Sequence, residues 1–456
     1  MQKILKSCME ASIFFMLYMI FGCGKMNEKI IKKRCDEMKE GNKQIVKIIT
    51  SLIFGSLGSS VLSFVIGLEI LSKTNSALAF GGTQLIGPVV SLVLLPFAGA
   101  VVDRFEKKKI IFIAQVVSIL MLVFYAFSLK SGFSVLISTY LLLIVLRLAD
   151  IFLSTAYGAA TIHLVDEADL QKVRSFEQLV SAVSQIIAPI IGGIIYVLIS
   201  LANIVLLEVV CETLAAMILM MVNFHYRKVS ESHVDESQDS LLKMFLSGLN
   251  YIKKDRLLVF AMVMGMSINF VLSSISVGIP YIQIHQLHFP TQAYSFSESA
   301  VGFGLILASL ILSMIKNIRY PLLNTYIYVI SLGTIMSSLG FILMQSLPLK
   351  WMIVIMIVGN FVMGVCITLL NVPLNTWLSA YVDPQFQGRV FHFLMTGVQL
   401  LMPLGIVFYS FLFEVPNGGL TFFISGIVLI VMMVLLPILL QANLKSAEIK
   451  PQENQA

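Results

Sequence analysis

Residues 99–109 read Gly-Ala-Val-Val-Asp-Arg-Phe-Glu-Lys-Lys-Lys and lie between two long apolar runs, 77–99 and 110–129. The last seven positions of this stretch hold four cations and two acids, although only 12% of the chain is charged. Charged side chains are costly in hydrocarbon, so this stretch must lie in water. The pattern predicts two membrane-spanning helices joined by a charged turn.

The composition extends this interpretation to the whole chain of 456 residues. Hydrophobic residues make up 58% of it, and its mean hydropathy is +0.91. Soluble globular proteins average about 25% charged residues, and a soluble core could not bury so much apolar surface. Because backbone polar groups in lipid must be satisfied within a helix, we expect an all-α polytopic membrane protein.

Twelve apolar runs approach or exceed the roughly 20 residues that a spanning helix needs. Six precede a polar stretch and six follow it, which predicts two six-helix bundles. The runs cover residues 45–71, 77–99, 110–129, 133–160, 178–200, 202–224, 257–281, 298–315, 322–346, 350–373, 390–413 and 418–440.

Lysine and arginine fall unevenly on the two sides of these spans. One side, which also carries both chain ends, holds 25 of the 31, whereas the other holds Lys73, Lys130 and Lys350. The positive-inside rule then places both ends in the cytoplasm, so the net charge of +6 needs no nucleic-acid partner. The expected domains are an N-terminal extension 1–44, bundles 45–224 and 257–441, a cytoplasmic linker 225–256 and a tail 442–456.

Residues 11–23 form a shorter apolar run that follows Lys3 and Lys6, as in a signal peptide. Cleavage there, or a thirteenth span, would export the cation-rich segment 25–47 against the charge rule. The simpler interpretation is an upstream start codon, which would leave residues 1–24 out of the mature protein. Translation followed by cleavage is the alternative.

Three of the charged residues inside predicted spans are candidates for function, because intramembrane ionisable groups are rare and costly. Glu69 lies in the first span; Arg147 and Asp150 lie in the fourth, three residues apart and on one helix face. The Arg147–Asp150 pair is either a titratable site beside a fixed cation or an ion pair that locks helices. Glu69 is either functional or an acid that reaches water.

No catalytic, metal or cofactor site is predicted. The cysteines form no CxxC motif, His285 and His288 have no third metal ligand nearby, and no nucleophile–base constellation is visible. A Walker sequence for ATP binding is also absent from the chain. We therefore expect a protein that is not an enzyme.

The charged stretch resembles the loop between the second and third helices of the major facilitator superfamily. Five residues carry this resemblance, namely Gly99, Asp103, Arg104, Lys107 and Lys108. A second element in the fifth span, Pro189, Gly192 and Gly193, resembles one found in exporters of that superfamily. The sequences at 371–375 and 387–391 are similar to those of its macrolide-efflux branch.

The resemblance implies an exporter of a small amphipathic molecule, driven by proton antiport with alternating access and functioning as a monomer in the plasma membrane of a bacterium. It also implies that the charged turn acts as a conformational switch, and that the first, fourth, seventh and tenth spans line a cavity. The residues that these spans would offer are Glu69, Arg147, Asp150, Asn269, Asn360 and Asn371. The expected partners are the substrate, protons and the bilayer.

Within the charged turn, Asp103 is expected either to pair with Arg104 or to cap the start of the next helix. The alternatives to export are a transporter of a lipid, siderophore or metabolite with another direction or coupling, or a non-transporting sensor or enzyme. Glu208 and Glu212 lie four residues apart in the sixth span. In the superfamily fold this span is peripheral, so we expect Glu208 near headgroup water and assign Glu212 no role.

Overall fold

The computed structural model describes residues 28–165, 167–224, 249–315, 318–383, 386–415, 417–441 and 443–444, and these contain helices and no strands. Twelve of the helical segments are long and apolar enough to cross a membrane. The predicted fold class is thereby confirmed. Segment 1–24 and most of the predicted linker and tail lie outside the described residues.

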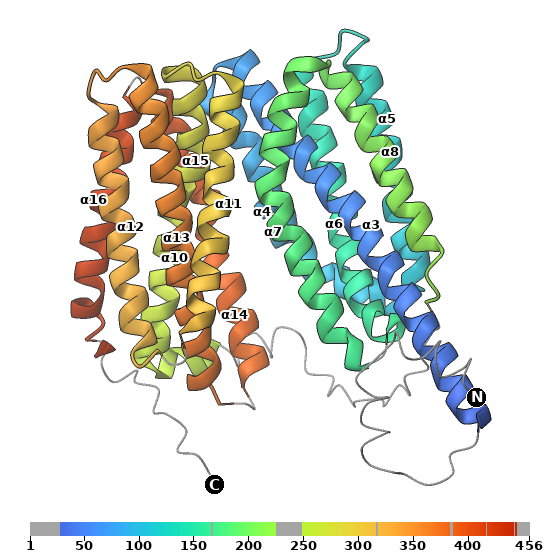
Figure 1. Cartoon of the computed structure of the whole chain (residues 1–456). Helices are drawn as coiled ribbons and strands as arrows, with labels where there is room; N and C mark the ends of the chain where they lie inside the picture. Colours follow the sequence, from blue (N-terminus) through green and yellow to red (C-terminus); the bar gives the residue numbers. More distant parts are fainter. Residues whose placement is uncertain are drawn as a thin grey trace.

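The first six spans form one bundle, in which α3 packs against α7 and α8, and α6 against α4 and α5 (Figure 1). Short connections hold consecutive helices antiparallel. The helices are α3 (Glu28–Thr74), α4 (Ala77–Arg104), α5 (Lys107–Ser128), α6 (Val135–Leu164), α7 (Glu167–Leu198) and α8 (Leu201–Met220).

The remaining helices form the second bundle, in which α12 packs on α16, α11 on α13 and α10 on α15. They are α10 (Arg256–Tyr281), the π-helix η1 (Ile282–Gln286), α11 (Thr291–Met314), α12 (Pro321–Leu343), α13 (Leu349–Tyr381), α14 (Gln387–Gln399), α15 (Leu401–Glu414) and α16 (Gly418–Leu439).

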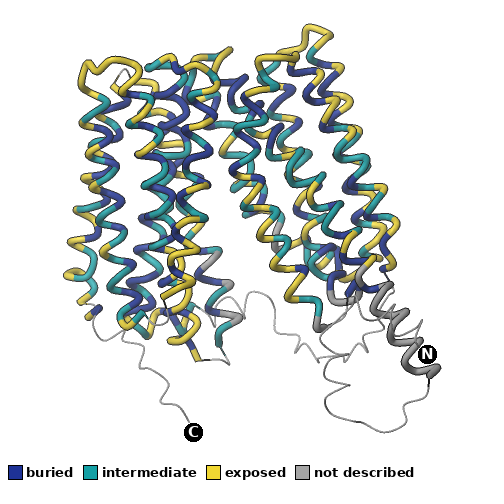
Figure 2. Tube along the Cα trace, in the orientation of Figure 1, coloured by how far each residue is buried: buried dark blue, intermediate teal, exposed yellow. Residues whose placement is uncertain are grey.

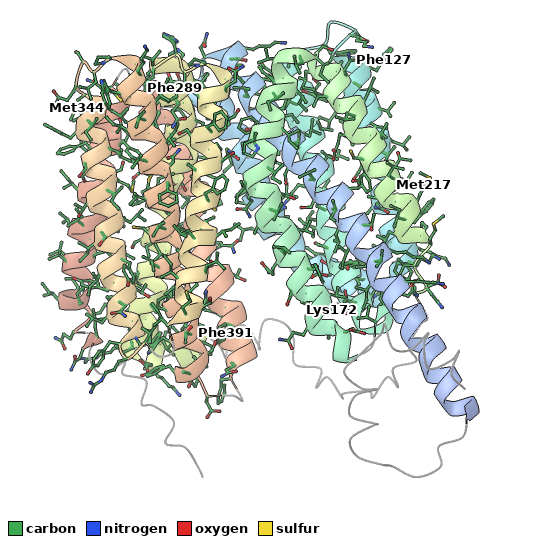
Figure 3. The ribbon with its side chains drawn as sticks, in the orientation of Figure 1. Phe127, Lys172, Met217, Phe289, Met344 and Phe391 are labelled. Atoms are coloured by element: carbon green, nitrogen blue, oxygen red, sulfur yellow. The ribbon has the colours of Figure 1, made fainter. Side chains whose placement is uncertain are left out.

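The outward faces of both bundles carry the exposed residues, whereas the buried residues lie between helices (Figure 2). Many exposed side chains are large and apolar, such as Phe127 and Met217, which lie at the periphery in Figure 3. In water such a surface would drive aggregation. In a bilayer it faces lipid chains that are equally apolar.

Several helices extend beyond the predicted spans: α3 begins at Glu28, α11 begins at Thr291, and α13 ends at Tyr381. Helix α7 begins at Glu167, about three turns before the predicted start. These first turns are polar and carry an Arg174–Glu177 ion pair of 2.8 Å, so hydropathy alone does not predict them. The predicted eleventh span is divided between α14 and α15 at Leu400. Pro403 explains this break, since its ring clashes with the carbonyl of Gln399, four residues earlier.

The charged turn is much shorter than the sequence suggests. Asp103 and Arg104 belong to the last turn of α4, and Lys107 begins α5, so that Phe105 and Glu106 alone lie outside the helices. The helices continue into the charged residues because long charged side chains can extend from a helix surface to water. We call the membrane side that holds Phe105 the turn side, and the other the far side.

Candidate functional site

The two bundles contact each other in the half of the molecule toward the far side and diverge toward the turn side (Figure 1). Phe64 of α3 stacks on Tyr294 of α11 with ring centroids 5.3 Å apart. Closer to the middle, the Ser299 hydroxyl donates to the Ile186 carbonyl of α7 over 2.8 Å. These contacts separate the space between the bundles from the far side.

The outermost of these contacts is made by Glu414, at the end of α15. Its carboxylate accepts hydrogen bonds from the Ser76 hydroxyl and, over 2.9 Å, from the backbone N–H of Leu78. Both donors belong to the start of α4 in the other bundle, where unsatisfied N–H groups and the helix dipole favour an anion. Glu414 therefore joins the two bundles at the far side.

A cavity of about 540 Å³ lies in the middle of the molecule, between α3, α4, α5, α6 and α8 of the first bundle and α10, α14 and α15 of the second. Much of its wall is apolar, with side chains such as Leu62 and Met402. Four charged side chains line it as well: Arg147, Asp150, Glu208 and Glu212. This combination suits an amphipathic ligand.

Arg147 is fixed by α4 instead of by Asp150. Its Nε and Nη2 atoms donate to the Ser91 hydroxyl over 3.2 and 3.0 Å. Among the described residues, the ion pairs within 4 Å do not include Arg147 with Asp150. The helix-locking ion pair considered from the sequence is therefore not formed in this state, and the Asp150 carboxylate is open to the cavity.

Glu208 and Glu212 reach the cavity from α8, which lies behind α3. Their carboxylates pass close to Gly58 and Gly55 of α3, where no side chain stands in the way. Glu208 is only 5% exposed, so the expectation that it lies in headgroup water is wrong. The sequence does indicate a buried functional pair here, because two acids four residues apart in an apolar span are costly. The expectation that this span is peripheral led to the wrong placement of Glu208.

Glu69 lies elsewhere, in a polar cluster near the end of α3. It is 7% exposed, forms a 2.6 Å ion pair with Lys73, and accepts a 2.6 Å hydrogen bond from the Tyr196 hydroxyl of α7. Its charge is thus compensated within the first bundle. Glu69 does not line the central cavity.

The three asparagines predicted for the cavity do not line it either. Asn269 and Asn371 donate to carbonyls one turn earlier in their own helices. Asn360 is buried in the second bundle, where its amide donates to the carbonyl and hydroxyl of Ser297 over 3.0 Å each. Of the six predicted cavity residues, the structure brings Arg147 and Asp150 together there.

The fifth-span element lies within α7, which stays continuous through Pro189. Gly192 faces Phe64 within the first bundle, and Gly193 faces Ser295 of α11 in the second. A side chain at either position would meet these neighbours, so the element permits close contact on the far-side half of the interface.

The residues of the charged turn, 99–109, do not line the cavity. Glu106 occupies the N-cap position of α5 and forms a 3.2 Å ion pair with Lys109, both exposed. The expected cap by Asp103 is therefore wrong, and no ion pair with a described residue involves the Asp103 carboxylate. Gly99 has open space around it, and Lys108 lies over the Phe224 ring.

Chemically, the cavity offers three carboxylates that interact electrostatically with one another, and one guanidinium held by a hydroxyl. Such groups can exchange protons and can bind a charged or hydrogen-bonding ligand. The described residues hold no group of three His, Cys, Asp or Glu side chains able to bind a metal.

Comparison with known proteins places this geometry in context. The sequence profile of the Major Facilitator Superfamily matches residues 48–359. Macrolide efflux protein A of Streptococcus pyogenes is 23% identical over 413 residues, covering 87% of this chain and 94% of the relative. The protein of the same name from Enterococcus faecalis is 23% identical over 333 residues, covering 71% and 97%.

Among solved structures, the nucleoside transporter NupG superposes with a TM-score of 0.64 at 14% sequence identity. The match covers 88% of this chain and 98% of that one. At this identity the likeness concerns the fold.

Proposed function

This chain belongs to the Major Facilitator Superfamily, and from that membership we propose that it exports a small amphipathic molecule in exchange for protons. The chain is a transporter and not an enzyme, and it is a multi-pass protein of the cell membrane whose relatives are bacterial. The proposal concerns the direction, the cargo and the coupling ion. The macrolide-efflux relatives make a macrolide-like cargo the first to test.

One observation carries the proposal: a cavity between the bundles combines apolar walls with carboxylates that form no ion pair within 4 Å with a described residue. The apolar walls suit the body of an amphipathic substrate. The carboxylates supply proton acceptors, and Asp150 is the one closest in sequence to the fixed cation Arg147. We assign Asp150 the main role in proton exchange.

Alternating access supplies the rest of the mechanism. The positive-inside distribution assigns the turn side to the cytoplasm, so contacts near Phe64, Ile186 and Glu414 would close the outward path. Release outside requires these contacts to break while the cytoplasmic ends of the bundles approach. In this scheme the turn from Gly99 to Lys109 takes part in closing the cavity on the cytoplasmic side. Gly192 and Gly193 allow the close helix contact that closes it on the outer side.

Glu414→Ala should shift the resting protein toward an outward-open state, because both charge-assisted hydrogen bonds to α4 are lost. Hydrogen bonds to charged groups contribute about 1.5–3 kcal/mol, which corresponds to a population change of roughly ten-fold or more. Spin labels at Lys130→Cys and Lys350→Cys, in otherwise cysteine-free protein, report the far-side separation of the bundles. Electron–electron resonance should show a longer distance in the variant.

Ser76→Ala serves as the control, since it removes one hydrogen bond and keeps the charge. Its shift should be smaller, and combined with Glu414→Ala it should add little. Equal distance distributions in all three proteins would show that Glu414 does not hold the bundles together.

The function itself is tested with inside-out membrane vesicles that contain or lack the protein. A panel of radiolabelled compounds, beginning with macrolides, is scored for accumulation when the vesicle interior is made acidic. Uptake that depends on both the protein and the pH gradient supports export by proton antiport. Uptake that is indifferent to the gradient, or that occurs only in right-side-out vesicles, contradicts it in favour of another coupling or direction.

A further inference from the structure

A second depression lies on the surface of the first bundle, between α3, α7 and α8. It has a volume of about 190 Å³ and is lined mainly by aliphatic side chains such as Leu57, Ile195 and Leu207. Leu207 is 49% exposed, and this surface faces the bilayer in a membrane-spanning bundle. The groove is therefore open to lipid-soluble molecules.

One charged residue, Glu208, is found in the described lining of this groove. Glu208 lines the central cavity as well, so it stands between the two spaces. Gly58 creates this arrangement, because a Cβ atom there would collide with the carboxylate. Removing a single side chain from α3 thus opens a place for an acid between the bilayer side and the cavity.

Among the described residues, none forms an ion pair with Glu208. It is only 5% exposed, and it makes no hydrogen bond or ion pair with a described residue. It lies seven residues from the start of α8, which is about 10 Å along the helix. An ionised carboxylate at that depth is unfavourable without a cation, and a cationic ligand would supply one.

We propose that this groove binds a single-chain cationic amphiphile from the bilayer, with its hydrocarbon part along α3, α7 and α8 and its cation at Glu208. The aliphatic walls exclude a polar ligand, and the neighbouring carboxylates of Glu212 and Asp150 repel an anion. A neutral amphiphile would leave Glu208 unpaired. This site would be the first binding site of the proposed exporter. Movement of the amphiphile from the groove past Gly58 into the central cavity rests on the proposed function.

The test uses fluorescence quenching in nanodiscs of zwitterionic phosphatidylcholine. Leu207→Trp places a reporter in the groove, within a Trp351→Phe background; the remaining Trp377 is fully buried. The probes are doxyl-labelled alkyl chains ending in trimethylammonium, hydroxyl or carboxylate groups, together with a doxyl-labelled phosphatidylethanolamine. The matched control is Ile424→Trp. Ile424 is 47% exposed and, like Leu207 in α8, lies six residues after the first residue of its helix.

The trimethylammonium probe should quench Leu207→Trp at a concentration several-fold lower than the hydroxyl probe, after normalisation to Ile424→Trp. Glu208→Gln should remove that preference. Equal quenching by all probes, a preference that survives Glu208→Gln, or a preference for the phosphatidylethanolamine would each overturn the proposal. The comparison of probes with Glu208 unchanged stays decisive even where the carboxyl variant does not fold.

This measurement needs no ion gradient and no transport. A groove that shows no charge preference therefore refutes the site and leaves the proposed export intact. Conversely, a clear preference in a protein that fails the vesicle assay refutes proton-driven export alone.

Discussion

Asp150→Asn is expected to reduce pH-gradient-driven transport to the level of vesicles without the protein, while the variant still folds. The side chain keeps its size and loses its ability to exchange a proton. Asp150 is open to the central cavity and is not held by Arg147, which bonds to Ser91. Its replacement should therefore remove coupling without removing a structural contact.

Two measurements separate coupling from binding. Accumulation in inside-out vesicles under a pH gradient should be lost, whereas exchange of labelled for unlabelled substrate without a gradient should persist. Asp169→Asn, the same change at the polar start of α7 outside the cavity, is the control and should keep full activity. Gradient-driven transport at the original rate would remove Asp150 from the mechanism and direct attention to Glu208 and Glu212.

Gly304→Ala should produce a clear loss of stability of the second bundle. Gly304 lies where α11 crosses α13, and a Cβ atom there would meet the Phe361 carbonyl and, at 2.9 Å, the Val365 nitrogen. Gly364 lies in the same way against the backbone of Val301. Because the obstructing atoms are backbone, the helices themselves must move apart.

The sign of this effect is informative. In an isolated helix, alanine is more favourable than glycine by about 0.8–1.0 kcal/mol. Overpacking costs typically about 1–3 kcal/mol, and close contact of small residues is a main source of helix association in lipid. We therefore expect Gly304→Ala to lower the thermal unfolding temperature measured on the purified protein in detergent.

Gly158→Ala is the matched control, because Gly158 lies inside α6 and a Cβ atom there would meet no neighbouring atom within 4 Å. It should leave the unfolding temperature unchanged or raise it. Equal temperatures for the two variants would show that the α11–α13 crossing tolerates a wider separation.

Much of the architecture could be predicted because hydropathy is a local property. A run of about 20 apolar residues must span a membrane wherever its neighbours lie, so the twelve helices were evident. The limits of α7 and the break before α15 were missed for different reasons. The polar first turns of α7 lie outside the hydropathy signal, and the effect of Pro403 on a preceding carbonyl is a matter of geometry.

The cavity was harder to predict, because its composition depends on which helix faces are turned toward it. Arg147 and Asp150 were found from their cost in lipid, yet the same argument selected Glu69, which Lys73 and Tyr196 compensate. It did not select Glu208 and Glu212, whose helix lies behind α3. Gly58 of α3 leaves the space through which the Glu208 carboxylate reaches the cavity.

By itself, the sequence determined the helices, their number and the family, since these follow from apolar length and from a motif of adjacent residues. The tertiary structure alone decided which charges share one cavity and which are already paired. A charge in a membrane is costly in every helix, but what it does depends on the groups within a few ångströms. Those groups come from other helices, at distances along the chain that no local pattern encodes.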